Sequence, residues 1–305
     1  MKKTVIVIAG PTAVGKTAVA IDVALAFGTE VLSADSRQCY RELNIGVARP
    51  TDEERAKVRH NFIASHSVYD NLHAASYEQY ALNVTRRVFQ KQDTIVVVGG
   101  TGLYIKALCE GMDAIPEIPA EIRKGLQADY EKYGLEWLQQ LVAKSDPHYF
   151  ASGETQNPHR LLRAMEVKQA TGRSILDFHS RQPSERPFDV VKIVLDLPRE
   201  ELYDRINRRV LQMMADGLEA EARALLPLRK LNALQTVGYK ELFEHFDGKC
   251  TLEASVNDIQ TNTRHYAKRQ LTWFRKEEGS AWMAPDSETV ISYLKENKSL
   301  SPLRE

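Results

Sequence analysis

Short runs rich in valine and isoleucine recur along the chain and alternate with segments whose apolar residues have helical spacing. The run at 94–98 is apolar throughout, which is typical of a parallel strand buried on both faces. This alternation predicts an α/β protein whose parallel sheet is flanked by helices. Strands are expected at 4–8, 30–34, 94–98 and 190–195, and helices beside them at 18–24, 77–90, 199–215 and 252–276.

The composition of the sequence changes between residues 116 and 187, where charged segments with helical character replace the β-branched runs. Prolines at 183 and 187 mark a return linker before the strand pattern resumes. We therefore expect a catalytic α/β core at 1–115 and 188–305, interrupted by a helical insertion domain at 116–187. Helices within the insertion are expected at 121–133, 135–144 and 160–171, whereas the segment 44–71 has no clear period and gives no prediction.

A glycine-rich loop follows the first predicted strand and opens the first predicted helix. It matches the phosphate-binding pattern G-x-x-x-x-G-K-T, in which backbone N–H groups and the helix N-terminus face an anion. Lys16 can neutralise an outer phosphate, and the Thr17 hydroxyl can hold Mg²⁺. An ordinary glycine-rich turn is the alternative. The expected phosphate-binding residues are Gly10, Pro11, Thr12, Ala13, Val14, Gly15, Lys16 and Thr17.

Two further strands end in candidate site residues. The second runs into Asp35-Ser36-Arg37-Gln38, and the third ends in a Gly-Gly-Thr-Gly-Leu-Tyr turn that contains Thr101. Because the carboxyl ends of parallel strands meet at one edge of a sheet, Asp35 is expected to share a crevice with the phosphate loop. A carboxylate that only caps the following turn is the competing interpretation.

The overall charge gives no basic field, since Lys plus Arg and Asp plus Glu each number 41. Any nucleic-acid site must therefore come from local clusters. Arg205 and Arg209 are expected to share a helix face. Arg264, Lys268 and Arg269 are interleaved with aromatic residues, a pattern that can bind phosphates and stack on bases but is also found on solvated amphipathic helices.

Three separated cysteines argue against a disulfide framework or a zinc site and suit a reducing compartment. The apolar run at the N-terminus is too short for a signal peptide, and no apolar stretch is long enough to cross a bilayer. These features predict a cytoplasmic protein without a membrane partner.

Six stretches together resemble the tRNA dimethylallyltransferases, also called tRNA isopentenyltransferases, of the bacterial type. They occur in the order of that family and span nearly the whole chain. Departures occur at residues 47–49 and 60–62, where Thr-Ala-Lys and a His pair are common, and the zinc finger of eukaryotic relatives is missing. The matching stretches are GPTAVGKT from Gly10, SADSRQCYRELNIG from Ser33, GGTGLY from Gly99, NPHRLLRA from Asn157, TVGYKEL from Thr236 and AKRQLTWFR from Ala267.

The resemblance implies transfer of the dimethylallyl group of dimethylallyl diphosphate to N6 of the adenosine immediately 3′ of the anticodon, with release of diphosphate and no consumption of ATP. It implies three catalytic residues: Asp35 as the base, Thr101 as a hydrogen-bond partner of the amine, and Arg209 on the leaving group. Arg205 would assist the phosphate loop, and Mg²⁺ would bind at Thr17.

The same resemblance implies that the partner is the anticodon stem-loop of tRNA, from which the target base is flipped into the crevice. A monomer is expected. The residues expected to contact tRNA are Asp35, Ser36, Arg37, Gln38, Thr101, Arg123, His159, Arg160, Leu161, Leu162, Arg163, Arg264, Lys268 and Arg269.

Three alternatives remain open from the sequence. A small-molecule kinase would use the same ATP-binding type of loop but leaves the basic C-terminal helix without a role. An adenylate isopentenyltransferase acting on free nucleotides would not need the helical insertion. A non-enzymatic RNA-binding module would use the loop as a nucleotide switch.

Overall fold

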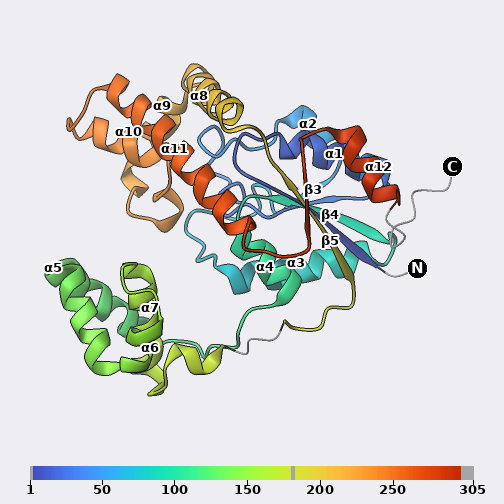
Figure 1. Cartoon of the computed structure of the whole chain (residues 1–305). Helices are drawn as coiled ribbons and strands as arrows, with labels where there is room; N and C mark the ends of the chain where they lie inside the picture. Colours follow the sequence, from blue (N-terminus) through green and yellow to red (C-terminus); the bar gives the residue numbers. More distant parts are fainter. Residues whose placement is uncertain (1–2, 180–182, 297–305) are drawn as a thin grey trace. The chain divides into compact units, whose positions relative to one another are not determined.

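The computed structural model describes residues 3–179 and 183–296, which form two compact units (Figure 1). Unit 1 contains the chain up to Glu110 and from Glu185 onward, and unit 2 is Gly111–Ser184. The expected insertion, 116–187, therefore begins later and ends later than the compact unit. The return boundary differs because Arg186 belongs to unit 1, where it pairs with Glu78 at 2.5 Å and donates to the carbonyl of Ala107.

Unit 1 is built on a six-stranded sheet with the order β3-β2-β4-β1-β5-β6, in which every neighbouring pair is parallel. The predicted fold class and the four predicted strands are confirmed. β3 and β6 were not predicted, because β3 is only two residues long and β6 is a partly exposed edge strand. The strands are β1 (Thr4–Ala9), β2 (Val31–Ser33), β3 (His60–Asn61), β4 (Thr94–Gly99), β5 (Asp189–Leu195) and β6 (Ser280–Met283).

Helices cover both faces of this sheet, so its central strands are buried on each side. Along β1, Val5 and Val7 pack into one apolar cluster, whereas Ile6 and Ile8 pack into the other. Figure 1 shows α3 and α4 on one face and α1 and α12 on the opposite face. These helices are α1 (Lys16–Ala26), α3 (Ala74–Val88), α4 (Gly102–Glu110) and α12 (Ser287–Glu296), and the short α2 (Asp52–Lys57) lies in the segment that gave no prediction.

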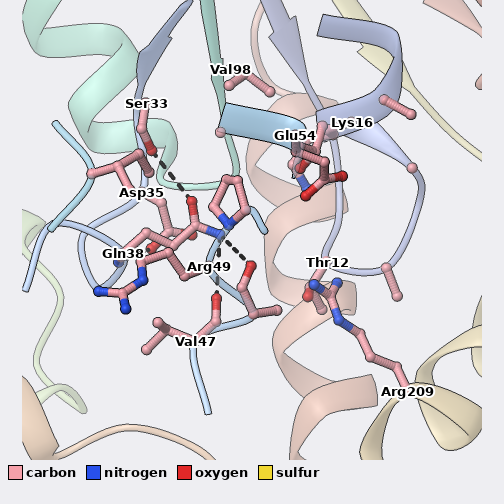
Figure 2. Close-up of a pocket in the computed structure, with 18 of the residues that line it drawn as sticks. Thr12, Lys16, Ser33, Asp35, Gln38, Val47, Arg49, Glu54, Val98 and Arg209 are labelled. Carbon is pink, nitrogen blue, oxygen red and sulfur yellow. Dashed lines mark hydrogen bonds between the residues drawn. The ribbon is translucent and has the colours of Figure 1, made fainter. Parts of the chain in front are cut away.

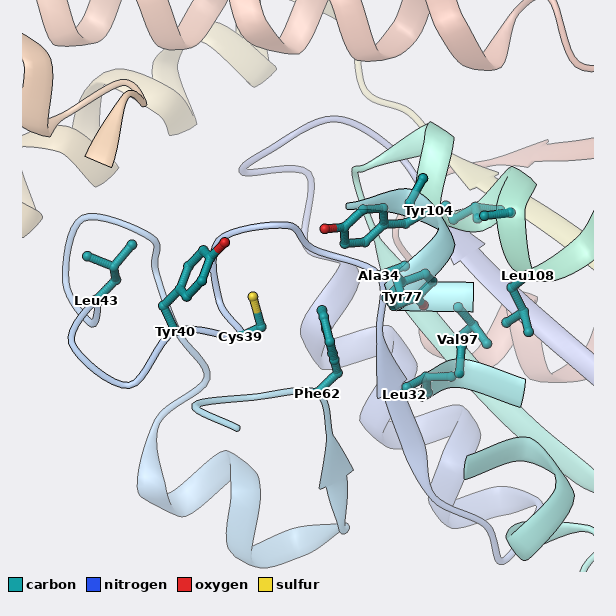
Figure 3. Packing of buried hydrophobic residues seen from close by; sticks show 14 of the residues in the cluster. Leu32, Ala34, Cys39, Tyr40, Leu43, Phe62, Tyr77, Val97, Tyr104 and Leu108 are labelled. Atoms are coloured by element: carbon teal, nitrogen blue, oxygen red, sulfur yellow. The ribbon is translucent and has the colours of Figure 1, made fainter. Parts of the chain in front are cut away.

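The face beneath α3 and α4 holds the larger cluster, which includes the side chains drawn in Figure 3. Tyr77 and Tyr104 stack with their ring centroids 4.3 Å apart, and Phe62 packs edge-on against Tyr77. Cys39 and Cys109 are also buried there, and burial raises the pKa of each thiol to about 12. These two cysteines are therefore apolar core residues and poor nucleophiles.

After β5 the chain builds a helical layer that ends in the long helix α11, which begins after the Thr251 N-cap. The predicted helix at 199–215 is found as α8, and the helix expected at 252–276 ends at 274. The elements of this layer are α8 (Arg199–Ala215), α9 (Leu218–Leu225), η2 (Leu226–Leu228), η3 (Asn232–Leu234), α10 (Tyr239–Phe246) and α11 (Leu252–Phe274).

Unit 2 is helical and has its own apolar core. α5 (Ala120–Ser145) is interrupted at Gly134, whose φ of 78° and ψ of −170° are not helical, so the predicted break between two helices is present. The other elements are α6 (Pro147–Ser152), α7 (Pro158–Thr171) and η1 (Ile175–Phe178). No helix in the described parts of either unit combines the length and the apolar character needed to cross a membrane.

Candidate active site

A cavity of about 740 Å³ opens at the carboxyl edge of the sheet in unit 1 (Figure 2). The phosphate loop after β1 and the segment after β2 form opposite walls, and residues of α8 and α11 complete it. In Figure 2, Asp35 and Gln38 lie on one side of the cavity, and Thr12, Lys16 and Arg209 lie on the other. A ligand here would therefore contact both the loop and the carboxylate.

The phosphate loop has the backbone that its glycines permit. Gly15 adopts a φ of 109° immediately before α1, and Ala13 has a φ of 65°. Of the eight loop residues expected to bind phosphate, five line the cavity: Thr12, Ala13, Gly15, Lys16 and Thr17. Gly10 serves packing, because a Cβ there would lie 2.6 Å from the carbonyl oxygen of Leu195. Pro11 and Val14 are buried beneath the loop.

Two cationic side chains from different elements face this cavity. Burial lowers the pKa of Lys16 to about 7, with a further reduction from Arg209 and an opposing effect from Asp35. Burial also lowers the pKa of Arg209, against the raising effects of Asp35 and Glu54. The Lys16 Nζ donates to the carbonyl of Pro11 at 2.6 Å, and no carboxylate among the described residues is within ion-pair distance of Arg209. Both groups would be stabilised by an anion.

Arg205 lines the same cavity, but its guanidinium is already bonded to other groups of the protein. Its guanidinium donates to the carbonyl of Val14 at 3.3 Å and pairs with Glu201 at 2.9 Å. It is therefore attached to the phosphate loop, and the expected assisting role is compatible with its position. Arg208, which also lines the cavity, pairs with Asp204 at 2.6 Å.

The sequence left open whether Asp35 caps a turn or faces the same crevice as the phosphate loop, and in the structure it does both. Its Oδ1 accepts from the backbone N–H groups of Arg37 at 2.8 Å and Gln38 at 3.1 Å, so the carboxylate caps the turn after β2. Asp35 nevertheless lines the cavity, and Oδ2 has no hydrogen-bond partner in the described part of the chain. One oxygen is structural and the other is available to a ligand.

Thr101 joins the second glycine-rich turn to the Asp35 segment. Its Oγ1 accepts from the backbone N–H of Ser36 at 3.1 Å and lies 3.4 Å from the Ser36 hydroxyl. Burial and the negative charge of Asp35 raise the pKa of Tyr266 to about 12, and the nearby Thr101 hydroxyl opposes this rise. Asp35, Thr101 and Tyr266 therefore form one polar group.

Tyr266 and Gln270 were not predicted as site residues, although both lie in a segment noted for its basic and aromatic residues. They are one helical turn apart on α11, and both line the cavity. Glu54 and His60, from the segment without a prediction, also line it. No local pattern indicated these four residues, because their proximity depends on how distant segments pack.

The cavity offers oxygen atoms for a magnesium ion but no protein cage. Thr17 and Ser33 line it with hydroxyl groups, and Asp35 and Glu54 line it with carboxylates. Nowhere in the described residues do three His, Cys, Asp or Glu side chains gather as a metal site would require. Mg²⁺ commonly binds through one or two protein oxygens plus water and substrate phosphates, and the Thr17 environment fits that mode.

Of the predicted RNA-contacting residues of unit 1, Asp35, Arg37 and Gln38 line this cavity or the one beside it. Arg37 lines an adjoining cavity of about 120 Å³, which also contains Asp35 and Tyr266. The Gln38 amide is already used, because it donates to the carbonyls of Val47 at 3.3 Å and Ala48 at 2.9 Å.

The three basic residues predicted on α11 differ in their surroundings. Arg264 donates to Asn207 at 2.6 Å and to Thr261 at 2.9 Å. Lys268 and Arg269 are exposed, and the Arg269 guanidinium lies 5.7 Å from the ring centroid of Tyr266. Lys268 and Arg269 are therefore the two of these residues that have free access to an external phosphate.

The residues predicted to contact tRNA in unit 2 differ in their exposure. Leu161 is fully buried and Leu162 is 6% exposed in the core of this unit, so a tRNA contact predicted at these two positions would have to come from their backbone. Arg123 and Arg163 both pair with the nearly buried Glu166, at 3.1 and 3.0 Å. Their guanidinium groups are therefore already partnered within the unit. Only His159 and Arg160, of the residues predicted in this unit, are exposed without such a pair.

Fold and cavity together define the class. The chain is an α/β protein with a parallel sheet flanked by helices, a cavity that Lys16, Arg209 and Asp35 line, and a helical unit inserted between α4 and β5. The family model described as IPP transferase matches residues 38–277. The chain belongs to this family, and it is a transferase.

Relatives and solved structures agree with this assignment. The tRNA dimethylallyltransferase of Christiangramia forsetii is 45% identical over 296 residues, covering 96% of this chain and 98% of that protein. The tRNA dimethylallyltransferase 1 of Porphyromonas gingivalis W83 is 46% identical, covering 95% and 97%. The crystal structure of the tRNA isopentenylpyrophosphate transferase of Bacillus halodurans has a TM-score of 0.71 at 34% identity, covering 97% of this chain and 95% of that one.

Proposed function

We propose that this protein transfers the dimethylallyl group of dimethylallyl diphosphate to N6 of the adenosine immediately 3′ of the anticodon in tRNA. The observation that carries the proposal is the single cavity in which the Asp35 carboxylate faces the phosphate loop, Lys16 and Arg209. Family membership and the relatives named above, which are tRNA dimethylallyltransferases, support the same reaction.

The reaction needs a base because the adenine amine is a poor nucleophile whose lone pair is delocalised into the ring. In the proposed step, the N6 lone pair forms a bond to C1 of the allyl group while the C1–O bond to diphosphate breaks. The electron pair of that bond leaves with the diphosphate, and the N6 proton passes to Oδ2 of Asp35. The Thr101 hydroxyl, which accepts from the Ser36 N–H, would orient the amine.

Charge develops on the leaving diphosphate, and the loop side of the cavity is suited to stabilise it. The N–H groups at the start of α1 and the Lys16 and Arg209 side chains supply positive charge from fixed positions. Since Lys16 has a pKa near 7 before ligand binding, a bound diphosphate would draw a proton onto it. Mg²⁺ held at Thr17 would neutralise further phosphate charge.

The acceptor base would have to leave the anticodon-loop stack to reach Asp35. In unit 1, Lys268 and Arg269 are exposed on α11, Arg269 beside the cavity-lining Tyr266, and both are suited to bind RNA phosphates. In unit 2, His159 and Arg160 supply exposed groups of the same kind. We propose that the protein acts as a monomer, because one chain contains the complete cavity.

The test is incubation of the protein with labelled dimethylallyl diphosphate, Mg²⁺ and bulk bacterial tRNA, followed by nucleoside analysis. We expect label in N6-dimethylallyladenosine without ATP, and no labelled product when free AMP or ADP replaces tRNA. A requirement for ATP hydrolysis would favour a kinase, and efficient labelling of the free nucleotides would favour an adenylate isopentenyltransferase. Binding of tRNA without transfer would indicate the non-enzymatic RNA-binding module.

A further inference from the structure

Gln270, in the middle of α11, is hydrogen-bonded to two glycine-rich turns at once. Its Oε1 accepts from the backbone N–H of Thr12 in the phosphate loop at 2.8 Å. Its Nε2 donates to the carbonyl of Gly100 in the second turn at 2.9 Å. The residue is only 6% exposed, so both ends of a buried amide are satisfied by backbone groups.

The second turn has glycines at the two positions where α11 comes closest to it. A Cβ at Gly100 would lie 2.0 Å from Nε2 of Gln270, and a Cβ at Gly102 would lie 2.1 Å from Nε1 of Trp273. Neither glycine has a positive φ, so the backbone conformation at these two positions does not require glycine. Their missing side chains let α11 approach the turn closely. The glycines of this turn thus serve helix packing as well as any approach of a ligand.

Thr101 lies between these two glycines and close enough to Tyr266 to lower its pKa, and Tyr266 is one helical turn before Gln270 on α11. The same helix therefore contacts the turn that would orient the acceptor amine and the loop that would hold the donor diphosphate. β1 and β4 are paired up to Ala9 and Gly99, and the two groups that Gln270 contacts, at Thr12 and Gly100, lie beyond that last pair. Gln270 therefore links the two turns at a point where β1 and β4 are no longer paired to each other.

We infer that Gln270 is a positioning residue for the transfer reaction, which fixes the donor-binding loop relative to the turn that carries Thr101. The inference rests on the proposed function, in which the donor and the acceptor amine are held by these two separate turns. The distance between the reacting atoms then depends on what links the turns. A displacement of 1 Å can reduce a rate about 100-fold.

The first test is Gln270→Met, which keeps the length and much of the volume of the side chain but removes both hydrogen bonds. We expect the single-turnover rate at saturating donor and tRNA to fall about 100-fold. The dissociation constants for dimethylallyl diphosphate and tRNA should change little, because the loop N–H groups, Lys16 and the basic surface residues remain. The matched control is Gln260→Met on the same helix, which loses one bond to the Asn207 carbonyl, 3.4 Å long, and should leave the rate unchanged.

The second test is Gln270→Glu, for which we expect a distinctive pH profile. A protonated carboxylic acid can accept from the Thr12 N–H and donate to the Gly100 carbonyl, but a carboxylate would place negative charge against that carbonyl. The ratio of the mutant rate to the wild-type rate should therefore rise as pH falls, whereas the same ratio for Gln270→Met should be flat.

The outcomes separate the inference from the proposed function. A Gln270→Met rate within about threefold of wild type, or a Gln270→Glu ratio that does not change with pH, would overturn the positioning role while leaving the proposed function intact. If the wild-type protein transfers no dimethylallyl group to tRNA, the proposed function and this inference are both overturned.

Discussion

Replacing Asp35 by asparagine separates the turn cap that its carboxylate forms from the proposed role as the base. The Asn side-chain oxygen can still accept from the N–H groups of Arg37 and Gln38, now 2.8 and 3.1 Å from Oδ1. The amide nitrogen would then replace Oδ2, the oxygen that does not cap the turn and is the proposed proton acceptor. We therefore expect Asp35→Asn to fold normally but to lack the base.

The expected loss in the chemical step is about 10²–10⁴-fold, the usual contribution of a positioned general base. This corresponds to about 3–5 kcal/mol of activation free energy. Stability should barely change in Asp35→Asn. In Asp35→Ala the turn cap is also lost, at a cost of about 1 kcal/mol, which would lower Tm by about 2–4 °C in a protein of this size.

The assay must separate binding from chemistry, because the charge of Asp35 also raises the pKa of Lys16. Without that charge, Lys16 is less protonated at neutral pH and the donor can bind differently. Single-turnover rates should therefore be measured at saturating donor and tRNA, with Tm recorded for each variant. If Asp35→Asn retains a rate within a few-fold of wild type under these conditions, Asp35 is not the base and its carboxylate is only a cap.

Four further predictions concern the phosphate loop and unit 2. Since the Lys16 pKa is about 7, the affinity of the wild-type protein for dimethylallyl diphosphate should fall about tenfold per pH unit above that value. The Lys16→Arg variant stays charged, so its affinity should not fall with pH in this way, and an equal pH dependence in both proteins would contradict this reasoning. Thr17→Ala should raise the Mg²⁺ concentration needed for half-maximal turnover, and Thr17→Ser should restore it; an unchanged Mg²⁺ titration would remove Thr17 as a ligand. Arg160→Ala should weaken tRNA binding and reduce its salt dependence by about one counterion without changing Tm, as filter binding at several salt concentrations would show. Arg163→Ala should instead destabilise unit 2 by about 1–3 kcal/mol, because Glu166 loses one of its two arginine partners; unchanged stability would show that Arg123 alone suffices.

Much of the architecture was predictable because strands and helices have local signatures. The apolar runs identified β1, β2, β4 and β5, and the spacing of apolar residues identified α8 and α11. The phosphate loop could be found because its glycines, its lysine and its flanking elements all lie within one short stretch. The same reasoning placed Asp35 at the correct edge of the sheet, since it follows a strand directly.

The residues at 159–163 show where local reasoning fails. A short helical stretch with basic and apolar residues is compatible with either face being buried, and the sequence alone does not say which. In the structure, Leu161 and Leu162 face the core of unit 2 and Arg163 turns to Glu166. The packing of α5 against α7, which brings Arg123 to the same glutamate, settled the orientation.

The sequence by itself determined the strand–loop–helix unit, the helical insertion and the carboxylate at a strand end, because each depends on neighbouring residues. Only the tertiary structure decided that α11 closes the site. Gln270 reaches Thr12 across 258 residues and Gly100 across 170, and Tyr266 meets Thr101 from the same helix. A hydrogen bond between such distant residues leaves no periodicity in the sequence, since it arises only when the parallel sheet and the C-terminal helices pack together.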